Sequence, residues 1–158
     1  MDASKRNATP ALRRAALTVA VVGVVMGSAA CGHLAMLVGG GAERPAATEF
    51  GHGPRTSSKH LYVAVLQPSQ PLRLRQLQTI PVRIVDGDGR PVEGAAVKID
   101  GGMPEHGHGL PTQPRSRAVG GGLYEIEGVR FNMGGWWELK LAIESPAGID
   151  NVTFNLSL

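Results

Sequence analysis

The chain has 158 residues, of which 42% are hydrophobic and 18% charged, and a single cysteine. This length accommodates one ordinary domain, and one cysteine excludes an internal disulfide framework. Residues 1–30 hold four of the 16 basic and one of the 13 acidic residues, which leaves 12 of each in the remainder. A balanced remainder excludes the broad basic surface that nucleic-acid binding requires.

The N-terminal segment has the organisation of a secretory signal. Basic residues precede an apolar stretch, residues 15–30, that ends in Ser28-Ala29-Ala30, so we interpret residues 1–30 as a signal peptide. Cys31 follows directly, and a small-residue run that closes on cysteine resembles a bacterial lipobox, although Ser28 stands where leucine is usual. Cys31 is therefore the expected lipidation site, and whether the lipoprotein or the ordinary signal peptidase cleaves the leader stays open.

An uncleaved membrane anchor is the alternative, because residues 15–42 contain no charged side chain and are long enough to span a bilayer. Gly32 and the run 39–41 make the second half of that stretch a poor helix, which favours the lipoprotein. Both interpretations place the domain outside the cytoplasm, in the cell envelope or periplasm, and tethered to a membrane. The Gly-rich and Pro-containing residues 31–58 are then a lipidated N-terminus and flexible linker.

From Lys59 onward, apolar and polar residues alternate between turn residues, the pattern of β-strands. The turn signals lie at 86–89, 120–121 and 146–148. We predict strands at 60–67, 79–86, 94–100, 114–119, 122–129, 136–144 and 151–158. About seven short strands in a domain of this size predict an all-β, immunoglobulin-like two-sheet sandwich over residues 59–158.

Alternation also assigns faces in the strand WWELKLAIE. Trp137 shares the inner face with Leu139, Leu141 and Ile143, whereas Trp136 falls on the face that carries Glu138 and Lys140. Trp136 is therefore predicted on the solvent side, as a candidate lid or partner contact, and local packing beneath the loop is the alternative.

The segment 102–112, GMPEHGHGLPT, is too rich in Gly and Pro for a helix or strand and carries Met103, His106 and His108. A second methionine, Met133, lies in the Gly-rich turn FNMGGWW. Imidazole and thioether groups suit copper. Solvated loop histidines and space-filling methionines are the alternative interpretation.

Strand direction brings these two segments together. If each link reverses the chain, strands 94–100 and 122–129 run the same way and end at the same end of the sandwich, where Met103 and Met133 follow them. Two imidazoles with two thioethers match Cu(I), and Cu(II) becomes suitable if Glu105 or water joins. A structural zinc site or a hard Ca²⁺ or Mg²⁺ site takes other donors.

The runs GGMPEHGHGLPT and LYEIEGVRFNMGGWWELKL and the closing DNVTFNL resemble the YtkA-like domain, related to FixH-type proteins. The resemblance covers about residues 60–158. It implies a small exported or membrane-tethered β-sandwich associated with copper handling and respiratory oxidase assembly. Met103, His106, His108 and Met133 match that family's copper-ligand positions, and Trp136 and Trp137 match its aromatic pair.

Two functions follow as hypotheses. The first is a tethered copper-binding module that sequesters copper or delivers it to a cuproprotein such as a respiratory oxidase. The alternative is a metal-free, immunoglobulin-like interaction domain, because fold alone does not fix function. We expect no enzymatic activity, since the sequence contains neither G-x-S-x-G nor H-E-x-x-H.

Overall fold

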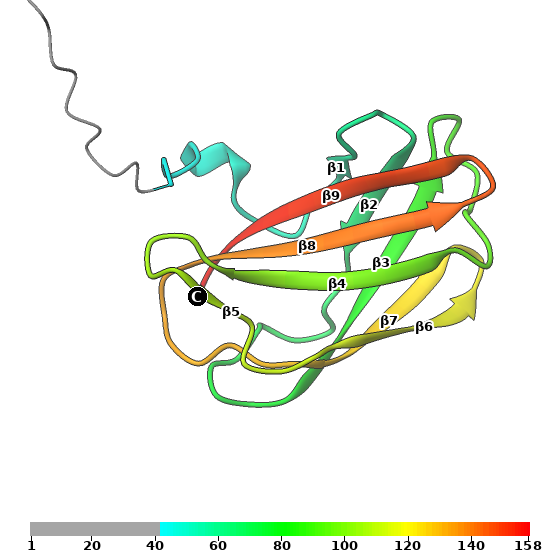
Figure 1. Cartoon of the computed structure of the whole chain (residues 1–158). Coiled ribbons are helices and arrows are strands. Elements are labelled where there is room, and N and C mark those ends of the chain that lie inside the picture. Colours follow the sequence, from blue (N-terminus) through cyan, green and yellow to red (C-terminus); the bar gives the residue numbers. More distant parts are fainter. Residues whose placement is uncertain (1–41) are drawn as a thin grey trace, which may run out of the picture. The chain divides into compact units, whose positions relative to one another are not determined.

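A computed structural model describes residues 42–158, so the predicted signal peptide, Cys31 and the first part of the predicted linker lie outside the described residues. Within residues 42–158 no helix has the length and apolarity needed to cross a membrane. The described chain is all-β, which confirms the predicted fold class (Figure 1). Its elements are η1 (Ala47–Glu49), β1 (Arg55–Thr56), β2 (Tyr62–Leu66), β3 (Gln78–Asp86), β4 (Ala96–Met103), β5 (His108–Gly109), β6 (Arg115–Gly120), β7 (Leu123–Val129), β8 (Trp136–Ser145) and β9 (Gly148–Ser157).

The strands form two antiparallel sheets that enclose one core. The first sheet has the order β1-β2-β3-β7-β6, and the second has the order β5-β4-β8-β9. Figure 1 shows the two sheets as the two layers of a sandwich. The chain crosses from the first sheet to the second between β3 and β4 and again between β7 and β8. The second of these crossings carries Met133.

The core follows the predicted alternation along β8 and β9. Trp137 is 1% exposed, and Leu139, Leu141 and Ile143 are fully buried. Val152, Phe154 and Leu156 of β9 lie in the same cluster, together with side chains of β2, β3 and β7 from the opposite sheet. Burying a large apolar side chain contributes about 1.5–3 kcal/mol, so these rows dominate the stability of the sandwich.

Trp136 is the exception, and its predicted place on the solvent side is wrong. The side chain is only 1% exposed. Phe50 packs against it edge-on, with ring centroids 6.4 Å apart and planes at 65°. Asn155 accepts a hydrogen bond from the Trp136 indole N–H over 2.9 Å. Trp136 thus lies on the outer face of the sheet but beneath another part of the chain, and it offers no surface as a lid.

That covering segment is residues 42–58, which we call the arm. The sequence placed these residues in a flexible linker, whereas the structure gives them η1 and β1, and β1 pairs with β2. Phe50 bridges Asn155 of β9, and the N–H of Gly51 donates to the Asn155 carbonyl over 2.9 Å. The β-structure therefore begins before Lys59, the predicted start of the domain.

The segment 102–112 also contains more regular structure than its Gly and Pro content indicated. β4 continues through Met103, and the short β5 pairs with it, Gly102 opposite Gly109 and Met103 opposite His108. The segment is thus a β-hairpin with a tight turn rather than an irregular loop. A two-residue strand such as β5 is too short to produce a visible alternation in the sequence.

Candidate metal centre

The turn between β4 and β5 places both candidate histidines at the tip of a hairpin. Pro104 occupies its second position, where the fixed φ of proline suits a type I turn. The N–H groups of His106 and Gly107 both donate to the carbonyl oxygen of Met103, over 3.0 and 2.9 Å. Gly107 has φ +67°, a conformation that glycine adopts without strain, and it turns the chain back so that His108 lies opposite Met103.

The imidazole rings of His106 and His108 lie face to face. Their centroids are 5.7 Å apart and their planes differ by 13°, and both residues are exposed. The lone pair of an imidazole nitrogen lies in the plane of its ring, so two stacked, nearly parallel rings must rotate before both can bind one ion. Exposed side chains change rotamer within nanoseconds or less, so both imidazoles can reorient to bind one ion.

Met133 lies in the link between β7 and β8, which is fixed along its backbone. The carbonyl oxygen of Met133 accepts a hydrogen bond from the Trp137 indole N–H over 2.9 Å. Gly135 exchanges two backbone hydrogen bonds with Leu158, of 2.7 and 3.1 Å. The Met133 side chain itself is 39% exposed. A fixed backbone with an accessible thioether is a suitable arrangement for a soft ligand.

Met103 differs from the other three candidates because it belongs to the core. Its side chain is 1% exposed, and it lies on the same, inner face of β4 as Val97. A Cβ atom built at Gly135 would lie 2.9 Å from Cε of Met103, so this side chain packs directly against the backbone of the β7–β8 link. Met103 therefore connects the hairpin to the link that carries Met133.

The pairing of β4 with β8 in the second sheet shows that the two segments lie at one end of the sandwich. Gly102, near the end of β4, pairs with Glu138, near the start of β8. The β7–β8 link leads directly into that start. Figure 1 shows the β4–β5 hairpin and the β7–β8 link at the same end of the molecule, on the left. This is the placement that strand direction predicted on the condition that each link reverses the chain.

A hollow of about 380 Å³ lies beside the hairpin. His108 and Met103 line it together with Asp100 and Glu138. The Glu138 carboxylate is engaged with the Lys140 ammonium over 2.7 Å. Nitrogen, sulfur and oxygen donors thus border one concavity.

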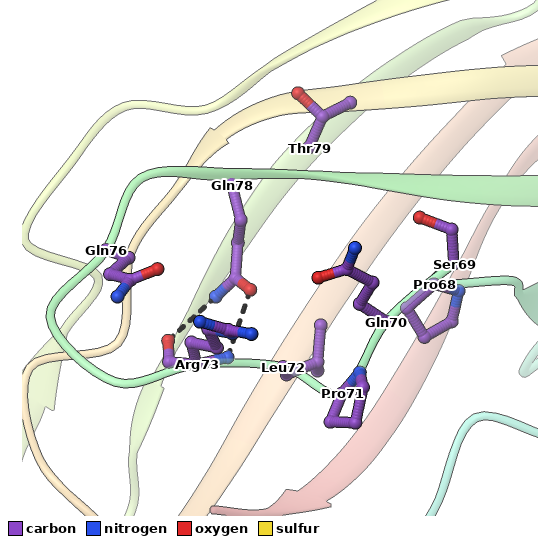
Figure 2. A pocket seen from close by; sticks show the side chains of 9 residues that line it. All are labelled: Pro68, Ser69, Gln70, Pro71, Leu72, Arg73, Gln76, Gln78 and Thr79. Carbon is purple, nitrogen blue, oxygen red and sulfur yellow. Dashed lines mark hydrogen bonds between the residues drawn. The ribbon is translucent and has the colours of Figure 1, made fainter.

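A second hollow, of about 280 Å³, lies in the segment between β2 and β3 and at the start of β3 (Figure 2). Gln78 and Arg73 both line it, and the Gln78 side-chain amide accepts from the Arg73 N–H and donates to the Arg73 carbonyl over 3.1 and 3.0 Å. Its lining contains no histidine, methionine or carboxylate. It therefore lacks the donors that copper prefers, and the first hollow is the better candidate.

Glu105, between Pro104 and His106 in the turn, forms an ion pair that the sequence did not indicate. Its carboxylate lies 3.2 Å from the Arg44 guanidinium of the arm. The two residues are 61 positions apart, and the sequence interpretation assigned Arg44 to a linker. No local pattern therefore signalled this contact.

Among residues 42–158, no three His, Cys, Asp or Glu side chains are grouped closely enough to hold a metal ion. The candidate set differs from such groups because two of its four members are methionines. The structure brings His106 and His108 together, and it places Met103 beneath the link that carries Met133.

The comparison with known proteins found one family. The family model described as YtkA-like matches residues 57–142, a range that contains the β4–β5 hairpin and the β7–β8 link. No curated protein and no solved structure matches the chain. The family match spans more than half of the 158 residues, so the chain belongs to the YtkA-like family.

Proposed function

We propose that this protein is an extracytoplasmic copper-binding module in which His106, His108, Met103 and Met133 hold one copper ion. The observation that carries the proposal is the pair of stacked, exposed imidazoles on a hairpin that packs against the link bearing an exposed thioether. Two nitrogen and two sulfur donors suit Cu(I) better than any hard divalent ion.

The four donors have different roles in this proposal. The imidazoles and Met133 are accessible and take the ion from solvent or from a donor protein. Met103 contributes its thioether from the edge of the core. A thioether is a weak, soft ligand, and it resists the oxidation that a thiol undergoes outside the cytoplasm. A site built from weak thioether ligands releases its ion readily, which suits transfer to a cuproprotein such as a respiratory oxidase.

The membrane tether is part of the same proposal. Lipidation of Cys31 after removal of residues 1–30 attaches the protein to the outer surface of a membrane. This arrangement keeps the module near membrane-bound cuproproteins.

The test is an anaerobic competition titration of Cu(I) between the purified full chain and a chromogenic chelator. Replacing His106 and His108 together by Ala should weaken Cu(I) binding more than tenfold, since loss of groups that merely support metal ligands already weakens binding by about 10- to 100-fold. His60→Asn is the matched control, because it removes an exposed histidine at φ +62° that lies outside both segments, and Asn tolerates this conformation. Equal affinities of the wild type and the double variant would overturn the proposal.

A further inference from the structure

An ion pair joins the arm to the turn between β4 and β5 that carries His106. The Arg44 guanidinium donates from Nη1 to both carboxylate oxygens of Glu105, over 3.2 and 3.5 Å. This pair connects the arm to the β4–β5 hairpin across 61 residues of sequence.

The position of Arg44 is set by packing as well as by charge. Its guanidinium carbon lies 5.3 Å from the centroid of the Phe50 ring, within the range of a cation–π contact. Phe50 in turn packs edge-on against the buried Trp136. Arg44 is therefore held over the turn by a stack that is anchored in the second sheet.

Glu105 is the oxygen donor adjacent in sequence to His106. Carboxylate oxygen is a hard ligand that Cu(II) accepts readily, whereas Cu(I) prefers sulfur and nitrogen. While Arg44 holds the carboxylate, the hairpin turn offers the ion imidazole and thioether donors but no free carboxylate. Recruiting Glu105 to the metal competes with the ion pair, because the guanidinium and the ion would share the same two oxygens.

We propose that Arg44 is a specificity-determining residue that holds Glu105 away from the copper ion and thereby favours Cu(I) over Cu(II). The inference rests on the proposed copper function. Glu105 is either paired with Arg44 or bound to the metal, and an ion shifts this equilibrium only by the difference in its interaction with the two states. The ion pair opposes Cu(II), which gains from the carboxylate, but does not oppose Cu(I). Because exposed ion pairs contribute little, the preference attributable to Arg44 is about two- to fivefold.

The experiment compares the ratio of Cu(I) to Cu(II) affinities in the full chain and its variants. Cu(I) is titrated anaerobically against a chromogenic chelator, and Cu(II) is titrated with glycine as competitor. Arg44→Ala should raise the Cu(II) affinity about two- to fivefold and change the Cu(I) affinity by less than twofold. Arg55→Ala is the charge-matched control in the arm, because within residues 42–158 its guanidinium bonds to the carbonyl oxygens of Pro54 and Glu49 and to no carboxylate.

A double-mutant cycle then separates the carboxylate from the loss of positive charge. In a Glu105→Gln background, Arg44→Ala should leave the affinity ratio unchanged. The inference is overturned if Arg44→Ala does not change the ratio in the wild-type background, or if it changes the ratio equally with Gln at position 105. A wild-type protein that binds neither ion overturns the copper function itself, and the inference with it.

Discussion

The indole N–H of Trp136 donates a hydrogen bond to Oδ1 of Asn155 over 2.9 Å, and both side chains are buried. Trp136 lies on the outer face of β8, where alternation predicted exposure. The arm covers this face, because Phe50 packs against the indole ring. The outer face of the second sheet therefore has a small core of its own.

This burial predicts that both tryptophans are structural. Trp136→Ala should lower the free energy of unfolding by about 3–5 kcal/mol, as expected for a large buried aromatic side chain, and Trp137→Ala should have a comparable effect. Urea unfolding followed by circular dichroism measures both. A loss below about 0.5 kcal/mol for Trp136→Ala, typical of exposed positions, would contradict the packing described for the arm.

The contact between Phe50 and Trp136 shows how much of this fold the sequence specifies. Alternation in β8 and β9 predicted the inner rows correctly, because two-residue periodicity states which side chains share a face. It does not state what covers the other face. The covering residue, Phe50, lies in a Gly-rich stretch without periodicity, so its contact with Trp136 had no local signal.

The candidate site was predictable to a similar extent. Strand parity placed the hairpin and the β7–β8 link at one end, and the residue types indicated soft ligands. The burial of Met103 agrees with the alternative interpretation, a space-filling methionine. The strand pattern did not place Met103 in a strand, because β4 extends three residues beyond its predicted end, through two glycines that weaken the pattern. The Arg44–Glu105 pair depends on the path of the arm, which the sequence did not predict.

The contact between Met103 and the β7–β8 link gives a second prediction. Gly135→Ala places a Cβ atom 2.9 Å from Cε of Met103 at φ +127°. Gly51→Ala is a matched control, because φ is +130° and no atom lies within 4 Å of the added Cβ. Gly135→Ala should therefore be the more destabilising of the two, by about 1 kcal/mol, the low end of the cost of overpacking, because the atom that the new methyl group meets is the end of a flexible side chain.

Thermal unfolding of the two glycine variants provides the measurement. The Gly135 variant should also bind Cu(I) more weakly, because the added methyl group displaces Met103. Equal destabilisation of the two variants would show that Met103 does not press against the link.

Asp150 gives a prediction about pH. Its carboxylate is buried, and burial alone would raise its pKa, but hydrogen bonds hold the pKa below the usual value. These bonds come from the Ser57 hydroxyl and from the N–H groups of Asn151, Lys59 and Leu61. A lowered folded-state pKa means that the stabilisation is complete above the unfolded pKa of about 3.9 and disappears as the pH falls through the folded value.

Asp150→Asn should accordingly destabilise the protein at pH 7, and the difference from the wild type should shrink as the pH falls below about 3.9. Unfolding titrations from pH 7 to pH 2 measure this difference. A difference that stays constant over the whole range would show that the carboxylate's charge does not stabilise the junction between the arm and β9.

The proposed tether is tested by Cys31→Ser in a bacterial host. The substitution should release the folded protein from the membrane fraction, because it removes the thiol to which lipid attaches. Fractionation and N-terminal sequencing measure the outcome. Retention in the membrane with an uncut N-terminus would support the transmembrane anchor instead.

The proposed site binds one copper ion through imidazoles and thioethers from two segments of the fold. X-ray absorption at the copper edge of the Cu(I)-loaded full chain is the decisive measurement, because nitrogen and sulfur ligands scatter differently. We expect a first shell with both nitrogen and sulfur, a reduced sulfur contribution in Met133→Leu, and a lost nitrogen contribution when His106 and His108 are both replaced by Ala. A wild-type first shell without sulfur, or a shell that none of these substitutions changes, would contradict it.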